Sequence, residues 1–425
     1  MKTVALIEPY QGGHHFTYLR LFTETLLDLG CRVMTFSQEP NLLLEAMAAN
    51  RPNRSDYLYA FEMHPMQPKP LPLLGRVRTL PGIGPVPQLS GTLSRWKQAA
   101  TVVRTAAQQI GHEPDLVFFN WLDGYFSHYL THHFIDLVFP YNWAGLYFRP
   151  GYLRYEKRSL PLLKARLAHY SLARSRNCRA VGVVDEWVVD KLQRDLTAPV
   201  IPFPDFTDET APDPNYELVN QIREKARGRK IIGLTGALSK RKGVVTLLKV
   251  AQQAAEKNWL FVIVGALSEH QFHQEYGQRF PEEYAWVKSV AESSPDNCFF
   301  HLDRIPGESQ FNALIQACDV VFAAYENFPY SSNILTKAAV FQKPVVASQG
   351  FCMGKRVEHF QVGLTIPEGS VTHCMEALDH LLSDDPAIAT RLAFDFGGLR
   401  ISHSLEKLGR MFTTILDTTD KYQAA

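Results

Sequence analysis

The sequence predicts an α/β protein of two domains, each formed by a parallel β-sheet with helices on its faces. The chain has 425 residues, whereas a single core usually stops growing at roughly 250 to 300 residues. Short apolar runs rich in β-branched and aromatic residues alternate with longer stretches of helical periodicity, which is typical of parallel sheets. This alternation occurs twice, on either side of a proline-containing segment at 205–228.

The first half of the chain contains five expected strands, in a domain that we place at 1–204. The strands are expected at 4–7, 32–36, 116–119, 180–184 and 200–203. Between the first two, Leu19, Phe22 and Leu26 recur at helical spacing, and Gly30 follows as a helix stop. The first part of the chain therefore predicts one strand–helix–strand unit.

The second half repeats the pattern beyond an expected linker at 205–228, which contains acidic residues, prolines and a closing basic run. We expect a second domain at 229–392. Its strands are expected at 230–235, 260–264, 298–301, 319–323 and 344–347. The remaining segment, 393–425, predicts a helix over 405–416.

The charge balance and the cysteines exclude several classes of protein. Lysine and arginine number 44, aspartate and glutamate number 43, and the formal net charge of +1 gives no general attraction to nucleic acid. The six cysteines form no Cys-x-x-Cys pair, which favours reduced thiols. No stretch approaches the roughly 20 apolar residues that span a bilayer. We therefore expect a cytoplasmic globular protein without a nucleic-acid partner.

The first candidate site follows the first expected strand, where open α/β sheets bind their ligands. Gly12 and Gly13 allow close approach of the backbone to a ligand, and the following helix offers unpaired N–H groups to an anion. His14 and His15 come directly after these glycines. A tight turn with two surface histidines explains the same residues, and the G-x-G-x-x-G spacing of a dinucleotide site is absent.

The second candidate site has the same place in the second domain, in the loop that follows the strand at 230–235. This loop contains Gly236, Ser239, Arg241 and Lys242, and three consecutive cations precede a predicted helix. A diphosphate needs several donors at close range, and cations beside a helix N-terminus supply charge and backbone N–H groups together. A solvated basic turn is the alternative interpretation.

The third candidate site follows the strand at 319–323. Glu326 can accept hydrogen bonds from sugar hydroxyls, and Ser331, Ser332 and Asn333 precede a helix as N-cap residues do. Capping alone explains the last three residues, but their hydroxyl and N–H groups also suit a phosphate or a sugar. Because two such loops leave strand ends of one domain, they predict an elongated anionic ligand such as a nucleotide diphosphate.

The second half also resembles the donor domain of GT-B glycosyltransferases, in particular the retaining enzymes of family 4. The matching stretches are 236–243, 261–265, 300–319 and 335–348, the last of which ends in Pro-Val-Val-Ala-Ser. Gly12 and Gly13 resemble the first loop of the acceptor domain in the same family.

The resemblance implies two Rossmann-like domains that face each other across a cleft, with the C-terminal segment 393–425 packed back on the first domain. It implies that Lys242 binds the diphosphate of the donor, whereas Ala237 stands where the family usually has an arginine. Two glutamates of the family's donor motif are replaced, by Pro329 and Lys337.

The activity that the resemblance implies is transfer of a hexosyl group, with retention, from a nucleotide-diphosphate sugar to a carbohydrate, lipid-linked or small-molecule acceptor. No cofactor is expected, and no metal, since no Asp-x-Asp occurs in the chain. His14 and Asp123 are the candidate catalytic residues, although Asp123 also suits a helix N-cap. Because the two glutamates are replaced, a non-catalytic nucleotide- or sugar-binding protein and a nucleotide-sugar epimerase stay open as alternatives.

A basic segment at 152–179 carries eight lysines or arginines against one glutamate, with Leu160, Leu163 and Leu167 on one face of a predicted helix. Such a helix can lie on an anionic membrane surface, which would give peripheral contact with the inner face of the membrane. A helix packed on the core with a solvated basic face explains the same pattern.

Overall fold

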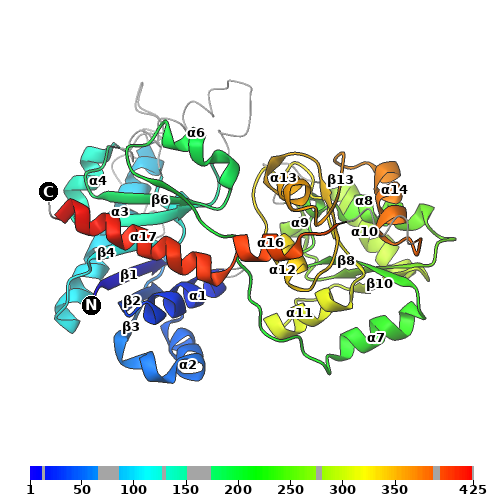
Figure 1. The fold of residues 1–425 in the computed structure, drawn as a ribbon, viewed down its shortest axis with the longest axis horizontal. Coiled ribbons are helices and arrows are strands. Elements are labelled where there is room, and N and C mark those ends of the chain that lie inside the picture. Colours follow the sequence, from blue (N-terminus) through cyan, green and yellow to red (C-terminus); the bar gives the residue numbers. More distant parts are fainter. Residues whose placement is uncertain are drawn as a thin grey trace. The chain divides into compact units, whose positions relative to one another are not determined.

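The computed structural model describes residues 1–11, 15–65, 86–126, 131–150, 174–273, 280–385 and 393–423. The chain divides into two compact units, and each contains one parallel sheet (Figure 1). Unit 1 consists of Met1–Pro204 and Leu405–Ala425, and unit 2 consists of Asp205–Ser404. The expected fold class, two Rossmann-like α/β domains, is confirmed.

The sheet of unit 1 has seven strands in the order β3-β2-β1-β4-β5-β6-β7, and the neighbouring strands pair in parallel. These strands are β1 (Thr3–Glu8), β2 (Arg32–Ser37), β3 (Leu58–Glu62), β4 (Leu116–Phe119), β5 (Trp143–Tyr147), β6 (Cys178–Val183) and β7 (Val200–Pro202). Every residue of β1 and β4 is buried, as expected for central strands of a parallel sheet that is covered on both faces.

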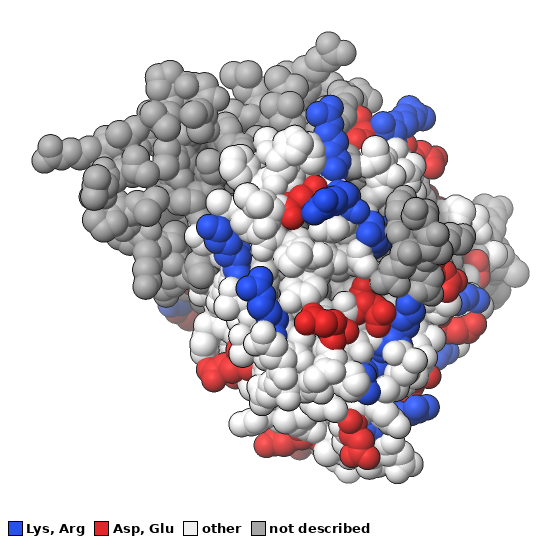
Figure 2. Space-filling model, turned by 90° about the vertical axis from the view of Figure 1, so that its left-hand side faces the viewer, with Lys and Arg blue, Asp and Glu red and all other residues white. Residues whose placement is uncertain are grey.

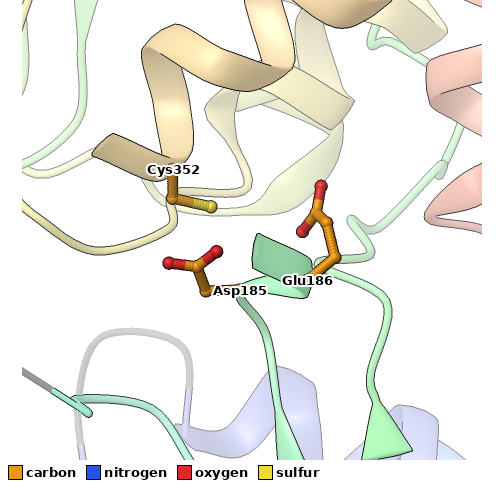
Figure 3. Close-up of side chains that lie close together, drawn as sticks. All are labelled: Asp185, Glu186 and Cys352. Carbon is orange, nitrogen blue, oxygen red and sulfur yellow. The ribbon is translucent and has the colours of Figure 1, made fainter. Parts of the chain in front are cut away.

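Helices cover both faces of this sheet. On one face, Trp96 of α3 packs against Phe119 of β4 and Trp143 of β5. On the other face, Phe22 of α1 contacts Phe118 of β4 edge to face. The helices of unit 1 are α1 (His15–Asp28), α2 (Pro40–Asn50), η1 (Pro52–Tyr57), α3 (Val86–Ile110), η2 (Leu122–Tyr125), α4 (His132–Val138), η4 (Glu186–Val188), α6 (Val189–Gln193) and α17 (Leu405–Gln423). Asp185 lies at the start of η4 (Figure 3) and caps it, since its carboxylate accepts the Trp187 N–H at 3.0 Å.

Helix α17 joins unit 1 after the chain has passed through the whole of unit 2, and it lies beside α1 (Figure 1). Phe412 of α17 is fully buried, with ring centroids 5.2 Å from Phe22, 5.1 Å from Phe118 and 5.8 Å from Phe203. The segment 393–425, which we expected to act as one piece, is divided. Its first part contains Leu399, which is buried in the core of unit 2.

The sheet of unit 2 has six strands in the order β10-β9-β8-β11-β12-β13, also paired in parallel. These strands are β8 (Lys230–Thr235), β9 (Trp259–Val264), β10 (Cys298–His301), β11 (Val320–Ala323), β12 (Val345–Ser348) and β13 (Gly363–Ile366). Both sheets therefore place their first strand in the centre, next to the point where the strand order reverses. Open α/β sheets bind ligands beyond the carboxyl ends of the strands at this point.

Two apolar cores flank the sheet of unit 2, one against α8, α10 and α14 and the other against α7, α11, α12 and α13. The helices of unit 2 are α7 (Glu217–Ala226), η5 (Lys240–Lys242), α8 (Val244–Gln253), α9 (Glu269–His273), α10 (Pro281–Ser293), α11 (Glu308–Ala317), α12 (Ile334–Val340), α13 (Phe351–Phe360), α14 (Val371–Leu381) and α16 (Phe396–Ser402). Cys352 lies near the start of α13 (Figure 3).

The segment 205–228 is not the free linker that the sequence suggested. It contains α7, whose residues Leu218, Val219 and Ile222 are buried in the core of unit 2. Its acidic residues are also engaged, since the Asp205 carboxylate pairs with the buried Arg356 guanidinium at 2.9 Å. The segment therefore belongs to unit 2.

Three strands were not expected from the sequence: β3, β5 and β13. The basic segment 152–179 lies outside the described residues except for its end, and there Cys178 and Arg179 open β6 instead of continuing a helix.

The surface and the thiols agree with the composition. All six cysteines are buried free thiols. On the described part of the face of unit 1 in Figure 2, basic and acidic side chains are interspersed among uncharged ones. Of the helices in the described part of the chain, none combines the length and the apolar character that crossing a bilayer requires.

Candidate functional site

The loop after β8 leaves the sheet of unit 2 through two glycines with left-handed backbone. Gly236 has φ +93° and Gly243 has φ +74°, a region that favours glycine. A Cβ atom on Gly265, which follows β9, would collide with the Gly236 carbonyl oxygen. The loops after β8 and β9 therefore contact each other backbone to backbone, and no side chain from these glycines lies over the carboxyl end of β8.

Two of the three cations in this loop lie over aromatic rings at the end of β11. Lys242 Nζ donates to the Thr235 carbonyl oxygen at 3.1 Å and lies 5.6 Å from the centroid of the Tyr325 ring. Arg241 Cζ lies 4.5 Å from the centroid of the Phe328 ring. Both cations are partly exposed. The positive charge is therefore held at the carboxyl end of the central strand.

Glu326 connects the loops after β8 and β11. Its carboxylate accepts from Thr246 Oγ1 at 2.7 Å and from Lys240 Nζ at 3.3 Å, and its backbone N–H donates to the Arg241 carbonyl at 2.8 Å. The side chains of Lys240 and Glu326 are each 21 % exposed, so a ligand can reach this pair. The structure thus brings Glu326 together with the basic loop.

Two buried hydroxyl groups lie in and beside the same loop. Thr235 ends β8 and Ser239 precedes η5, and both side chains are buried. Neither hydroxyl oxygen has a hydrogen-bond partner among the described residues. Buried polar groups normally find a partner, so these hydroxyls are available to water or to a ligand.

The residues before α12 are divided between two roles. The Ser331 hydroxyl bonds to the Asp205 carboxylate and to Arg356 Nη1, so it is part of a buried internal network. Asn333 occupies the N-cap position of α12 but makes no side-chain cap bond, and Ser332 is partly exposed beside it. Simple capping therefore does not explain Asn333.

Lys337 of α12 is turned into the protein. Its side chain is 5 % exposed, and Nζ donates to Asn312 Oδ1 at 2.5 Å, Glu308 Oε2 at 2.9 Å and the Asp208 carbonyl at 3.3 Å. Pro329 is also buried. The Lys337 ammonium group is therefore engaged in bonds within unit 2.

In unit 1, a buried carboxylate ends the central strand. Glu8 is 2 % exposed, and its Oε1 accepts the Tyr10 N–H at 3.3 Å and lies 3.1 Å from His15 Nδ1. Burial raises the pKa of Glu8, and the neighbouring His15 imidazole opposes that rise. Sequence reasoning missed Glu8, because a polar residue at the end of an apolar run looks like the start of a loop.

Asn120 and Ser37 lie on either side of Glu8 and were also missed. Glu8 pairs with Ser37 in the register of β1 and β2, and the Asn120 backbone N–H donates to the Ile7 carbonyl at 3.1 Å. Both side chains are buried. The signal in the sequence is that a polar residue directly follows each of three expected strands, and it gains meaning only once the strand order is known.

An aromatic cluster borders these polar residues, and it consists of Tyr10, His15, Trp121 and Phe148. The Trp121 ring stacks on Phe148 at 4.1 Å, and the His15 ring lies 4.8 Å from Trp121 and 5.6 Å from Tyr10. All four side chains are partly exposed. The cluster gathers residues that follow β1, β4 and β5.

Asp123 does not cap a helix. Its two carboxylate oxygens accept the backbone N–H groups of Phe148 and Arg149, each at 2.9 Å, so Asp123 holds the segment that follows β5. Burial raises the pKa of Asp123 to about 6, although these hydrogen bonds oppose the rise. Gly12, Gly13 and His14 lie outside the described residues.

One family model matches part of the chain. Residues 216–394 match the family model described as "Glycosyl transferases group 1". No match was found among the curated proteins.

Solved structures resemble the whole chain. A sucrose-phosphate synthase from Thermosynechococcus elongatus is 18 % identical, with a TM-score of 0.65 and full coverage of both chains. A glycosyltransferase from Rickettsia africae is 14 % identical, with a TM-score of 0.64 and 99 % coverage of both chains. HepE from Anabaena, in complex with UDP and glucose, is 15 % identical, with a TM-score of 0.63 and coverage of 98 % of this chain and all of its own. This likeness shows that the chain has the GT-B fold.

Proposed function

We propose that this protein is a glycosyltransferase that moves a hexosyl group from a nucleotide-diphosphate sugar to an acceptor hydroxyl. The match of residues 216–394 to the group 1 glycosyltransferase family supports this proposal. The similar HepE protein was solved with UDP and glucose, and with UDP-glucose, which supports a nucleotide-sugar donor. Retention of configuration is part of the proposal and rests on the resemblance to the retaining family.

One observation carries the proposal most strongly: the basic loop at the carboxyl end of β8. Lys242 Nζ is held on the Thr235 carbonyl, and α8 begins directly after Gly243. A leaving diphosphate carries negative charge that must be neutralised as the glycosidic bond to the donor breaks. Lys242, Arg241 and the first N–H groups of α8 can supply this neutralisation. We therefore propose a reaction without a metal ion.

The remaining donor residues have roles that follow from their contacts. Gly236 gives the diphosphate close access to the backbone, and the Ser239 hydroxyl is free to donate to a phosphate oxygen. Glu326, Ser332 and Asn333 are proposed to meet sugar or phosphate groups beside this loop. Ser331 acts through its bonds to Asp205 and Arg356 and is proposed to hold the start of α12 in place.

On the acceptor side we retain Gly12, Gly13, His14 and His15 as the proposed acceptor loop, with His14 as the proposed catalytic residue. Asp123 is proposed to position the segment after β5, because both of its carboxylate oxygens are used by backbone N–H groups. A cytoplasmic location, with peripheral membrane contact through 152–179, remains part of the proposal.

The test is nucleotide binding by the full chain and by two lysine variants. In calorimetric titrations with UDP, GDP, ADP and their sugar conjugates, we expect one nucleotide to bind wild type selectively. Lys242→Ala should bind it roughly 10- to 100-fold more weakly, since a charge-assisted hydrogen bond is worth about 1.5–3 kcal/mol. Lys249→Ala removes an exposed lysine from α8 and should leave the affinity unchanged. Equal affinity in wild type and Lys242→Ala would remove Lys242 from the site, and no binding of any nucleotide would contradict the proposal.

The buried Lys337 favours one alternative, a GT-B protein that binds a nucleotide sugar without transferring it. In that case nucleotide affinity would persist, while no nucleotide would be released from the donor in the presence of any acceptor. A nucleotide-sugar epimerase would instead convert the donor without an acceptor. Product analysis by NMR of the donor sugar separates the three cases.

A further inference from the structure

In the described part of unit 1, two polar side chains are buried without hydrogen-bond partners at the carboxyl ends of the strands on either side of β1. Asn120 is 1 % exposed, and neither its amide nitrogen nor its amide oxygen has a hydrogen-bond partner among the described residues. Ser37 is 6 % exposed, and its hydroxyl is also unpartnered in the described part of the chain. Each such group costs about 1–3 kcal/mol of stability when it is left unsatisfied, so water or a ligand is needed to satisfy it.

The strand register places both side chains next to Glu8. Glu8 lies opposite Ser37, and Asn120 follows Phe119, which lies opposite Ile7. In paired parallel strands, opposite residues point to the same face, and residues two apart in one strand do so as well. Glu8 and Asn120 therefore share a face with Leu6 and Phe118, the face that α1 covers. A carboxylate, an amide and a hydroxyl thus form one polar row beneath the start of α1.

The chemistry of this row suits alcohol groups. A hydroxyl both donates and accepts, and it can bond at once to a carboxylate oxygen and an amide N–H. The buried Glu8 carboxylate disfavours an anionic ligand at the same place. Uncharged hydroxyl groups are therefore the ligand groups that satisfy Asn120 and Ser37 without conflict.

The aromatic cluster adds an apolar surface beside the row. His15 connects the two, because its Nδ1 lies 3.1 Å from Glu8 Oε1 and its ring lies 4.8 Å from Trp121. Ligand sites commonly combine aromatic walls with a few placed polar groups that fix orientation. A sugar ring is complementary to such a site, because its apolar C–H faces can pack on aromatic rings and the hydroxyl groups around its edge can bond to polar side chains.

We propose that the polar row of Glu8, Ser37 and Asn120, with the aromatic cluster Tyr10, His15, Trp121 and Phe148, binds an uncharged sugar ring of the acceptor. The acceptor is then a carbohydrate, or carries one at the reacting end. This inference rests on the proposed glycosyltransferase function and assigns the class of its second substrate.

The first test measures stability, because the Asn120 side chain has no hydrogen-bond partner to lose in the described part of the chain. Asn120→Leu has nearly the same shape, so it should leave the free energy of unfolding unchanged or raise it in urea unfolding. Asn312→Leu is the matched control in unit 2. Asn312 is also fully buried, but its amide donates to the Asp208 and Thr210 carbonyls and accepts from Lys337. The control should therefore destabilise the protein. A clear loss of stability in Asn120→Leu would mean that the amide is structural and would overturn the proposal.

The second test measures sugar binding by saturation-transfer NMR on the full chain. The probes are glucose, galactose and mannose, their methyl glycosides, and maltose, at millimolar concentration. Wild type should transfer saturation to the ring protons of at least one probe. Asn120→Leu and Trp121→Ala should each weaken the binding of that probe by roughly tenfold, which corresponds to about 1.4 kcal/mol, and this is measured from the transfer at a series of probe concentrations. Transfer to no probe, or equal transfer in wild type and both variants, would overturn the proposal.

Nucleotide titration separates this failure from failure of the proposed function. Asn120→Leu lies in unit 1 and should bind the donor nucleotide as wild type does. If wild type binds nucleotide but no sugar probe, the sugar assignment is wrong and the glycosyltransferase proposal stands. If wild type binds no nucleotide, the proposed function itself fails.

Discussion

The carboxyl ends of β1 in unit 1 and β8 in unit 2 occupy the same position in two sheets of matching strand order, yet their chemistry is opposite. Each strand has six residues and pairs with its neighbour in the same register. β1 ends in the buried Glu8, and β8 ends in Thr235 and leads into three cations. The two sheets therefore share their strand order, whereas the residues at the ends of their first strands differ in charge.

The two sites also differ in how their first two loops are joined. In unit 1, Gln38 after β2 donates from Nε2 to the Pro9 carbonyl at 2.7 Å. In unit 2, the equivalent pair is Gly265 and Gly236, whose backbones meet directly. A side chain that spans a gap can be shortened at modest cost, whereas a backbone contact leaves no room for a Cβ atom. Three substitutions test this comparison.

The largest effect is expected for Gly265→Ala. The new Cβ would collide with the Gly236 carbonyl, and Gly265 has φ +141°, which side chains rarely adopt. We expect a loss of more than about 4 kcal/mol in the free energy of unfolding of unit 2, together with loss of nucleotide binding. Gly350→Ala is the control, since Gly350 has φ +73° but open space around it, and it should cost about 1 kcal/mol. Equal losses in urea unfolding would show that the backbone contact is unimportant.

An intermediate effect, measured as the dependence of stability on pH, is expected for Asp123→Asn. The folded pKa of Asp123 is raised from 3.8 to about 6, so folding takes up a proton between these values. The contribution of Asp123 to the free energy of unfolding should therefore be greatest below about pH 4. It should fall by at most about 3 kcal/mol as the pH rises through 6. Asp123→Asn should remove this slope, as measured by urea unfolding across the window.

The exposed Asp190→Asn variant on α6 corrects for the loss of one negative charge. If wild type and Asp123→Asn show the same dependence on pH after this correction, the Asp123 carboxyl group does not titrate in the window.

The smallest effect is expected for Gln38→Ala. One hydrogen bond to the Pro9 carbonyl is lost, and a net loss of about 1 kcal/mol should follow. Thermal unfolding of Gln38→Ala, with the exposed Gln108→Ala of α3 as reference, measures it. A loss as large as that of Gly265→Ala would mean that both units join their loops equally tightly.

The strands that the sequence predicted are those with continuous β-branched or aromatic runs. All residues of β1, β4 and β9 are buried, and the nearly continuous apolar runs in their sequences predicted this. β5 was missed because Trp143-Ala144-Gly145-Leu146-Tyr147 contains small residues and no β-branched one. β3 and β13 lie at or near sheet edges, and their partly exposed residues dilute the apolar pattern.

The basic loop was predictable because its residues are contiguous, and Lys242, Arg241 and Glu326 do meet at one strand end. The polar row of unit 1 was not, because Glu8, Ser37 and Asn120 are distant in sequence and become neighbours only through the order β2-β1-β4. The role of Lys337 was also hidden, since nothing in its local sequence reveals the partners Asn312 and Glu308.

Helix α17 belongs to unit 1 but is synthesised after the whole of unit 2. Until residues 405–423 are made, Phe22, Phe118 and Phe203 lack the Phe412 ring that buries them. Unit 2 is continuous in sequence and can complete its core first. During synthesis, this apolar surface of unit 1 is therefore exposed while about two hundred further residues are made. Packing of α17 then covers the surface and lowers the tendency of the nascent chain to aggregate.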